Sequence, residues 1–148
     1  MTTDDDRPGP PVTSASVVVL SLARRVETEL NAALAPLGLT VARFGLLGHI
    51  AGVPGASFSE LARMSGITVQ SVHGAVKALV AAGLVRDRNT RAGSASTLEI
   101  TTEGALLLRR ARRAAAEVDE RLFGPDADPI QQRLGAAVRA AFPGPPPS

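Results

Sequence analysis

The polar side chains best suited to binding chemistry lie on one predicted helix, residues 68–82. Gln70, His73, Gly74 and Lys77 are three or four residues apart, so a helix places them on one face. No Asp or Glu occurs between residues 68 and 82. An acid-free polar face with a cation suits the phosphates and base edges of a nucleic acid, because a carboxylate there would repel the backbone charge. The alternative is an ordinary solvated helix face.

Each residue of this face offers a different contact. Gln70 can pair with adenine through two hydrogen bonds, and Lys77 suits a phosphate or a guanine. Gly74 either lets the helix backbone approach a ligand closely or simply weakens the contact.

A second group of cations follows the helix. Arg86, Arg88 and Arg91 lie within six residues, and Asp87 is the only acid among them. An Arg at the tip of a β-hairpin can enter the narrow minor groove of DNA, where the negative potential is enhanced. The alternative is a flexible charged turn.

Local signals predict the elements that position these two groups. Apolar spacing predicts a first helix that ends near residue 34. Further helices are predicted at about 40–50, 57–64, 68–82, 103–123 and 130–142, and short strands near 84–88 and 97–101. Thr40, Ser57 and Thr68 are expected N-caps, Ser57 and Glu60 form a capping box, and Gly83 ends the fourth helix. The fold class is therefore mainly α with a small β-hairpin wing, a winged helix-turn-helix domain with additional N- and C-terminal helices.

The same spacing predicts which side chains are buried. The helix at 68–82 is expected to bury Val69, Val72, Val76 and Leu79, and the long helix Leu107, Ala111, Ala114, Val118 and Leu122. The last helix is expected to turn Leu134, Ala137 and Val138 inward, and Met64 is expected in the core. The terminal helices hold more apolar surface than a small lobe can cover, which favours an isologous dimer.

Length and composition limit the class of protein to which the chain can belong. The chain has 148 residues, with 16 Lys and Arg against 14 Asp and Glu, and no Cys. The length fits a single domain, expected at 13–142 between disordered, Pro-rich tails at 1–12 and 143–148. The lack of Cys excludes disulfides, thiolate metal sites and thiol redox sensing. The acidic start and the absence of an apolar run of about 20 residues predict a cytoplasmic protein with no membrane partner.

Catalytic constellations are missing from the sequence. The chain has two histidines, His49 and His73, and no clustered ligands for a metal ion. It has no Gly-rich phosphate loop and no nucleophile elbow. We therefore expect no enzyme activity, no cofactor and no metal. Arg43 and His49 are candidates to line an effector pocket and meet a carboxylate, the alternative for His49 being a half-buried position on a helix shoulder.

A set of short motifs carries a family resemblance. In order along residues 22–123 these are Gly38-Leu39-Thr40, Phe44 with Leu46-Leu47, Glu60-Leu61-Ala62, Gly83-Leu84-Val85 and Leu98-Glu99-Ile100-Thr101 with Gly104. Their order and spacing resemble the MarR family of bacterial transcription regulators. The resemblance implies a nucleoid-associated homodimer that binds a palindromic operator in double-stranded DNA, often as a repressor. It also implies a DNA-binding lobe at 40–101, dimerisation helices at 13–36 and 103–142, and in many relatives release by a small aromatic acid.

Matched by position, the resemblance assigns a set of DNA contacts. These are Ser57, Ser59, Thr68, Gln70, Ser71, His73, Gly74, Lys77, Arg88 and Arg91. Two features depart from the family pattern. Ala92, Gly93 and Ser94 stand where the wing usually carries an Asp-Arg motif, and Gly74 stands where relatives often have an Arg or another polar residue. The departures leave an alternative open, a winged-helix dimer that acts as a protein-interaction module without specific DNA binding.

Overall fold

The computed structural model describes residues 14–88 and 97–144. Within these ranges the elements are α1 (Ala15–Leu34), the short 3-10 helix η1 (Ala35–Leu37), α2 (Val41–Gly52), α3 (Phe58–Ser65), α4 (Val69–Ala81), β1 (Val85–Asp87), β2 (Leu98–Ile100), α5 (Thr102–Phe123) and α6 (Pro129–Ala141). The two strands form an antiparallel hairpin that sets Arg86 opposite Glu99. The predicted wing residue Arg91, residues 1–13 and residues 145–148 lie outside the described residues.

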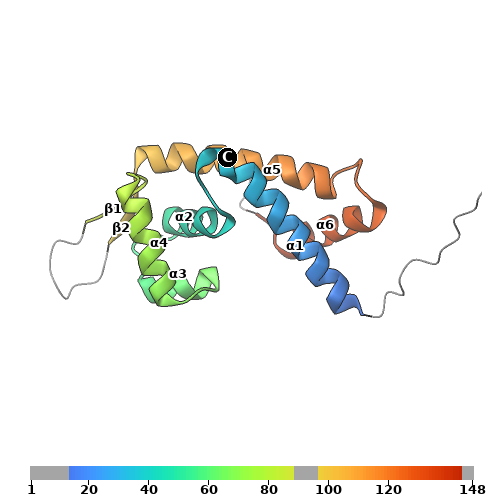
Figure 1. Ribbon diagram of the computed structural model, residues 1–148, viewed down its shortest axis with the longest axis horizontal. Coiled ribbons are helices and arrows are strands. Elements are labelled where there is room, and N and C mark those ends of the chain that lie inside the picture. Colours follow the sequence, from blue (N-terminus) through green and yellow to red (C-terminus); the bar gives the residue numbers. More distant parts are fainter. Residues whose placement is uncertain (1–13, 89–96, 145–148) are drawn as a thin grey trace, which may run out of the picture.

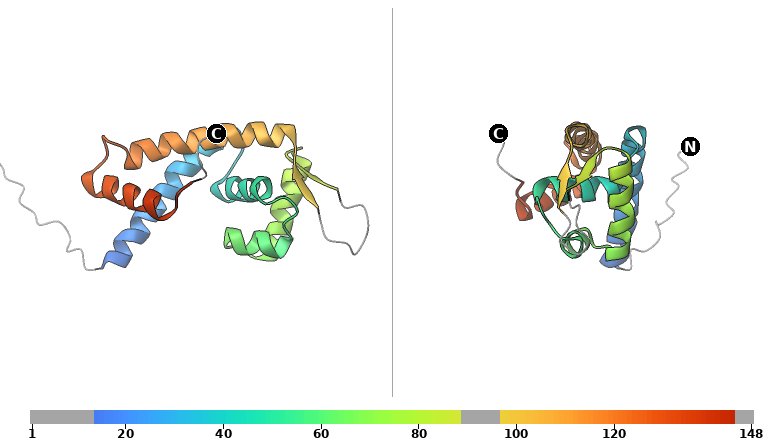
Figure 2. Two further views of the ribbon diagram at one scale, coloured as in Figure 1. Left: turned by 180° about the vertical axis from the view of Figure 1, so that it is seen from behind. Right: turned by 90° about the vertical axis from the view of Figure 1, so that its left-hand side faces the viewer.

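The long helix α5 connects two groups of elements. Helices α2, α3 and α4 and the hairpin gather beside its first half, whereas α1 packs against its middle and second half and α6 against its end (Figure 1). The view from behind shows the same separation (Figure 2, left). A small lobe that holds the helix-turn-helix is thus joined through one continuous helix to a separate pair of helices.

Side-chain caps set the starts of the lobe helices, as the sequence predicts. Thr40, Ser57 and Thr68 cap α2, α3 and α4, and each side-chain oxygen accepts a hydrogen bond from a backbone N–H of the first turn. In the capping box, Ser57 Oγ accepts from Glu60 N at 3.2 Å and Glu60 Oε2 accepts from Ser57 N at 2.7 Å. Because these signals are local, the predicted helix starts are correct within one or two residues.

The joint between α4, the hairpin and α5 depends on Thr101 and Gly104. Thr101 Oγ1 donates to the carbonyl oxygen of Gly83 at 2.6 Å and accepts from Gly104 N at 3.0 Å. A Cβ atom at position 104 would collide with the Leu84 carbonyl oxygen and with Ile100. Gly83 has a φ of 75°, in the left-handed region that favours glycine, and it ends α4 as predicted.

The core of the lobe contains most of the predicted residues. Its buried members include Leu46, Leu47, Ile50, Leu61, Val72, Val76, Leu79, Val85, Leu98 and Leu108. Two predictions are wrong. Val69 is 40% exposed because it is the first residue of α4 and lies before the turn that faces the core, and Met64 is 36% exposed in the last turn of α3.

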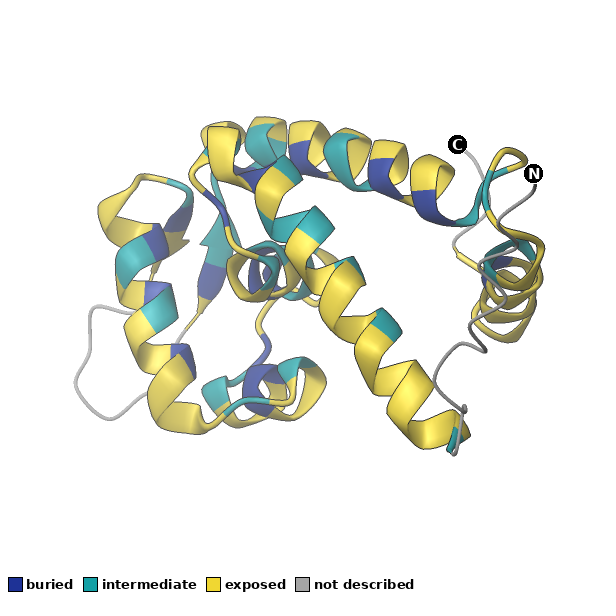
Figure 3. Ribbon diagram, turned by 45° about the vertical axis from the view of Figure 1, so that its right-hand side comes forward, coloured by how far each residue is buried: buried dark blue, intermediate teal, exposed yellow. Residues whose placement is uncertain are grey.

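The inward face predicted for the last helix is also wrong within this chain. Leu134, Ala137 and Val138 are exposed, and within α6, which is described throughout, only Gly135 is buried. A Cβ atom at Gly135 would meet Phe123 of α5, so the two helices are in close contact there. Because α6 packs mainly on the end of α5, its apolar side chains are left uncovered by the rest of residues 14–88 and 97–144. Figure 3 shows α6 and the first half of α1 as largely exposed.

An open apolar groove lies between these terminal helices. Its volume is about 390 Å³, and its lining includes Val19, Leu22, Val26, Leu30, Phe123 and Leu134. Contact between α1 and α5 closes one end of this region, where Leu34, Leu39 and Ala111 form a second small core.

Two properties of the described residues bear on membranes and metal ions. No single helix among them is long and apolar enough to cross a membrane, whereas α1 with η1 and α2 together meet that test as a pair bent by 72°. No group of three or more His, Asp or Glu residues in the described ranges is placed to hold a metal ion.

Candidate nucleic-acid interface

The polar face of α4 is exposed to solvent. Gln70, His73, Gly74 and Lys77 are all exposed, while Val72, Val76 and Leu79 on the opposite side are buried in the lobe core. The core therefore fixes the rotation of α4 about its own axis. A helix held in this way can present its exposed face to a groove of DNA without rearrangement.

The hydroxyl groups at the starts of α3 and α4 retain donors for an anion. Thr68 Oγ1 accepts from Ser71 N at 3.1 Å, and the Thr68 and Ser71 hydroxyls bond each other at 2.8 Å. Each hydroxyl has one hydrogen, so this pair uses one and leaves the other to donate. Ser57 Oγ accepts from Glu60 N and also keeps its own hydrogen, and Ser59 is exposed in the first turn of α3. Helix N-termini with free hydroxyl donors are suited to phosphate.

Two arginines of the wing, Arg86 and Arg88, lie within the described residues. Arg86 is exposed. Arg88 Nε lies 2.8 Å from Glu99 Oε2 of β2, so an acid partly neutralises this cation. The sequence carries no local signal for this pairing, because it depends on the register of the hairpin. Arg91 lies outside the described residues.

One aromatic contact on this surface has no signal in the sequence. The rings of Phe58 and His73 have their centroids 4.1 Å apart, with a tilt of 30° between their planes. Phe58 is the first residue of α3 and also packs against the lobe core. The two residues are 15 positions apart, and only the helix-turn-helix geometry brings them together.

A second candidate site is a hollow beside His49. It has a volume of about 230 Å³ and is lined by α2 and by the junction of α3 and α4, with Val41, Gly45, His49, Met64, Ser65 and Ile67 among its residues. Ser65 Oγ is buried and has no hydrogen-bond partner among the described residues. His49 is half-buried and lines this hollow, whereas Arg43 is exposed on α2 and is not part of the lining. The effector role of both residues stays a prediction.

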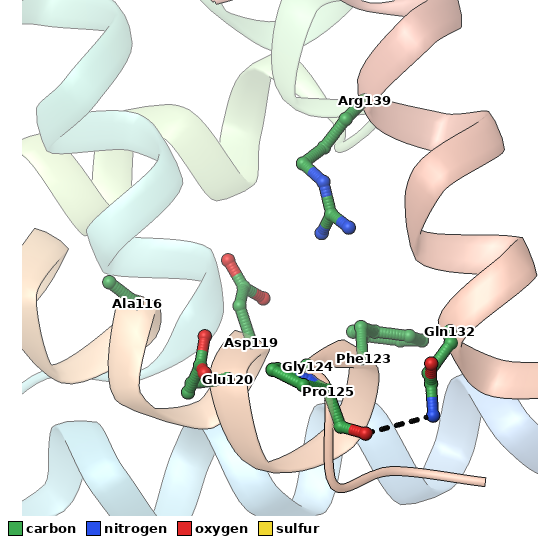
Figure 4. A pocket seen from close by; sticks show the side chains of 8 residues that line it. All are labelled: Ala116, Asp119, Glu120, Phe123, Gly124, Pro125, Gln132 and Arg139. Carbon is green, nitrogen blue, oxygen red and sulfur yellow. Dashed lines mark hydrogen bonds between the residues drawn. The ribbon is translucent and has the colours of Figure 1, made fainter. Parts of the chain in front are cut away.

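A larger cavity lies between parts of α5 and α6. It measures about 490 Å³, and Asp119, Phe123 and Arg139 are among its lining residues (Figure 4). Arg139 extends from α6 toward the carboxylate of Asp119 on α5 (Figure 4). Partial burial raises the pKa of Asp119, and the positive charge of Arg139 opposes this increase. Neither residue has a signal in the sequence that predicts this contact, because it depends on how α6 packs on α5.

The lobe combines a short helix, a tight turn, an exposed second helix and a hairpin, and these features define a winged helix-turn-helix protein. A sequence model described as MarR family matches residues 37–93. The HTH-type transcriptional repressor Rv2887 of Mycobacterium tuberculosis is 35% identical over 107 residues, which cover 72% of this chain and 77% of that protein. The chain therefore belongs to the MarR family of transcriptional regulators.

Solved structures agree with this assignment. The crystal structure of M. tuberculosis Rv2887 in complex with DNA superposes with a TM-score of 0.70 and 25% identity, covering 90% of this chain and 99% of that one. The structure of Rv2887 with p-aminosalicylic acid gives a TM-score of 0.69 and 26% identity, covering 86% of this chain and 98% of that one. The predicted winged-helix fold is confirmed.

Proposed function

We propose that the chain is a homodimeric transcriptional repressor that inserts α4 into the major groove of a palindromic DNA operator. The observation that carries the proposal is the exposed, acid-free face of α4, held outward by the burial of its opposite face. A relative that is named a repressor and is solved with DNA supports it. The protein acts by binding and not by catalysis, and it acts at the nucleoid in the cytoplasm.

The uncovered apolar helices support the homodimer. Val17–Leu20 on α1 and Ile130 and Val138 on α6 are exposed, and the apolar groove lies between these helices. A second copy would bury these surfaces in an isologous interface. We assign dimerisation to residues 13–36 and 103–142, and DNA binding to 40–101. The two copies of α4 would then contact half-sites about 10 bp apart.

Fluorescence anisotropy tests the DNA-binding proposal. The probes are a labelled duplex from upstream of the gene for this chain and a duplex selected by the protein from a random library, each with unlabelled competitor DNA at several salt concentrations. We expect Lys77→Ala to weaken binding and to flatten the salt slope by about one unit per subunit, because a phosphate contact is lost. Arg110→Ala, which removes an exposed cation on α5, is the matched control and should change little.

Two outcomes would overturn the proposal. One is binding of both duplexes no tighter than the competitor, which would favour the protein-interaction module instead. The other is an equal change in salt slope for Lys77→Ala and Arg110→Ala, which would show that α4 has no special role.

We further propose that the hollow beside His49 binds a small aromatic acid that releases the DNA. Its apolar wall, with Met64 and Ile67, suits an aromatic ring. His49 and the Ser65 hydroxyl, which no described residue pairs with, suit a carboxylate or phenol oxygen. A ligand there contacts both α2 and the junction of α3 and α4, so its binding can shift the helix-turn-helix. The structure of Rv2887 with p-aminosalicylic acid supports this ligand class.

Titration of the protein–DNA complex with salicylate tests the effector site. We expect release of DNA by the wild type, and a higher salicylate requirement for Ser65→Ala and His49→Ala. Ser65→Ala removes a hydroxyl that has no hydrogen-bond partner among the described residues, so the fold should be retained. Arg43→Ala is the control outside the hollow. An equal effect of all three substitutions, or none, would overturn this site.

A further inference from the structure

The contact between Phe58 and His73 restricts a side chain on the exposed face of α4. The ring centroids are 4.1 Å apart and the planes are tilted by 30°, which is a close stacked arrangement. Phe58 is partly buried against the lobe core, whereas His73 is exposed. One face of the His73 ring is therefore covered by a ring that belongs to a different helix.

The capping box before Phe58 and the lobe core beside it both fix the position of this residue. It is the first residue of α3, directly after Ser57, whose capping box with Glu60 fixes the backbone at that point. Its side chain contacts the core on the other side. The backbone N–H of Ser57, hydrogen-bonded to the Glu60 carboxylate, lowers the pKa of Glu60, as expected for a cap that stabilises the ionised carboxylate. Phe58 can therefore act as a fixed support for the imidazole.

A stacked imidazole interacts best through its edge. With one face covered, the ring nitrogens of His73 lie in the plane that remains open to a ligand. At least one of them carries a hydrogen in either protonation state, so the edge always contains a donor. Acceptors in the major groove include purine N7, and guanine adds O6 beside it. Lys77 has a long flexible side chain, and no aromatic ring of the described residues stacks on it, so it is better suited to a phosphate.

We infer that His73, oriented by its stack on Phe58, determines specificity by donating a hydrogen bond to a purine N7, preferably of guanine, and that Phe58 is a positioning residue. The inference rests on the proposed function, because it requires α4 in the major groove. The inference adds Phe58 to the DNA interface. It also gives two residues of α4 different roles: His73 recognises a base, and Lys77 contacts the DNA phosphates.

The stack can be tested in the free protein by NMR of the histidine rings. The chain has two histidines, and His73→Gln and His49→Gln assign their signals. We expect Phe58→Leu to move the His73 ring signals strongly, since the ring current of Phe58 is lost, and to leave His49 unchanged. Phe44→Leu, the same substitution at another partly buried core position, is the matched control. Similar His73 shifts in both variants would overturn the stack as a specific contact.

The base contact can be tested with 7-deazaguanine, which lacks the N7 acceptor. The probe is the duplex selected by the wild type from a random library, with each guanine replaced in turn. We expect wild-type affinity to fall roughly tenfold at one symmetric pair of positions. His73→Ala should bind the unmodified duplex more weakly and lose its sensitivity at that pair alone. Phe58→Leu should reduce this sensitivity, Phe58→Tyr should restore it, and Phe44→Leu should retain it.

These experiments distinguish failure of the proposed function from failure of the inference about His73 and Phe58. If wild-type protein selects no duplex over competitor, the proposed function fails and this inference fails with it. If the wild type binds specifically but His73→Ala keeps the complete 7-deazaguanine profile, only the inference about His73 fails. If His73→Ala changes the profile and Phe58→Leu does not, the positioning role of Phe58 is wrong.

Discussion

The guanidinium of Arg88 is paired across the hairpin with the carboxylate of Glu99, at 2.8 Å from Nε to Oε2. Arg86 is the direct register partner of Glu99, so the ion pair is diagonal. Both side chains remain substantially exposed, and such pairs contribute only about 0–1 kcal/mol to stability. The main consequence of the pairing is that part of the positive charge of the wing is neutralised.

We therefore predict that Glu99→Gln strengthens DNA binding. The substitution frees Arg88 for a phosphate and removes a negative charge, so affinity should rise for all sequences and the salt slope should steepen by up to about one unit per subunit. Anisotropy at several salt concentrations measures both. Glu103→Gln, which removes an exposed acid in the first turn of α5, is the control. Unchanged affinity in Glu99→Gln would indicate that Arg88 does not approach DNA.

Gly74 provides a second prediction, because the sequence left its role open. A Cβ atom there would meet nothing within 4 Å, so Gly74→Ala should stabilise α4 by about 0.5–1 kcal/mol in urea unfolding. If the backbone of α4 approaches DNA closely at this position, the same variant should bind DNA more weakly. Gly48→Ala, a comparable change in α2, controls for stability alone. Full DNA affinity in Gly74→Ala would exclude a close backbone approach.

The sequence predicts most of the lobe because its signals are local. Ser57 with Glu60, Thr68 and Gly83 each act within a few residues of their own position, and all four have the predicted roles. Contacts between distant residues carry no such signal. The stack of Phe58 on His73 and the ion pair of Arg121 with Glu29, at 3.3 Å, depend on how helices pack.

The wrong prediction of a buried apolar face on α6 has a different physical cause. Periodicity identifies an apolar face on α6 but does not identify what covers it. Leu134 and Val138 lie on such a face and are nevertheless exposed in the single chain. The same reasoning explains why the hollow beside His49 includes that residue and not Arg43: the residues that line a pocket depend on helix packing.

Gly104 provides a third prediction, on the joint between the hairpin and α5. A Cβ atom there would overlap the Leu84 carbonyl oxygen and Ile100, and the backbone oxygen cannot move without disturbing the hairpin. Gly104→Ala should therefore destabilise the protein by about 1–3 kcal/mol, despite the higher helix propensity of Ala. Urea unfolding measures the change. Gly48→Ala has open space and should not destabilise, so equal behaviour of the two variants would refute this packing argument.

The last prediction concerns two carboxyl groups with opposite pKa shifts. Burial raises the pKa of Asp119 above its ordinary 3.8, so the folded state binds its proton more tightly than the unfolded state does. The charged form therefore costs stability above the raised pKa, and this cost disappears as the pH falls below 3.8. Asp119→Asn should raise Tm at pH 7, with a difference that shrinks toward acid pH.

Glu60 should show the reverse sign. Its hydrogen bonds with Ser57 lower its pKa below the ordinary 4.5, so its carboxylate stabilises the fold above that pH, and this contribution is lost as the pH falls through the lowered pKa. Glu60→Gln should lower Tm at pH 7, again with a difference that shrinks toward acid pH. Thermal unfolding of both variants between pH 3 and pH 7 provides an internal comparison. A lower Tm for Asp119→Asn at pH 7 would mean that attraction to Arg139 outweighs burial, and that the two residues stabilise the packing of α6 on α5 as an ion pair.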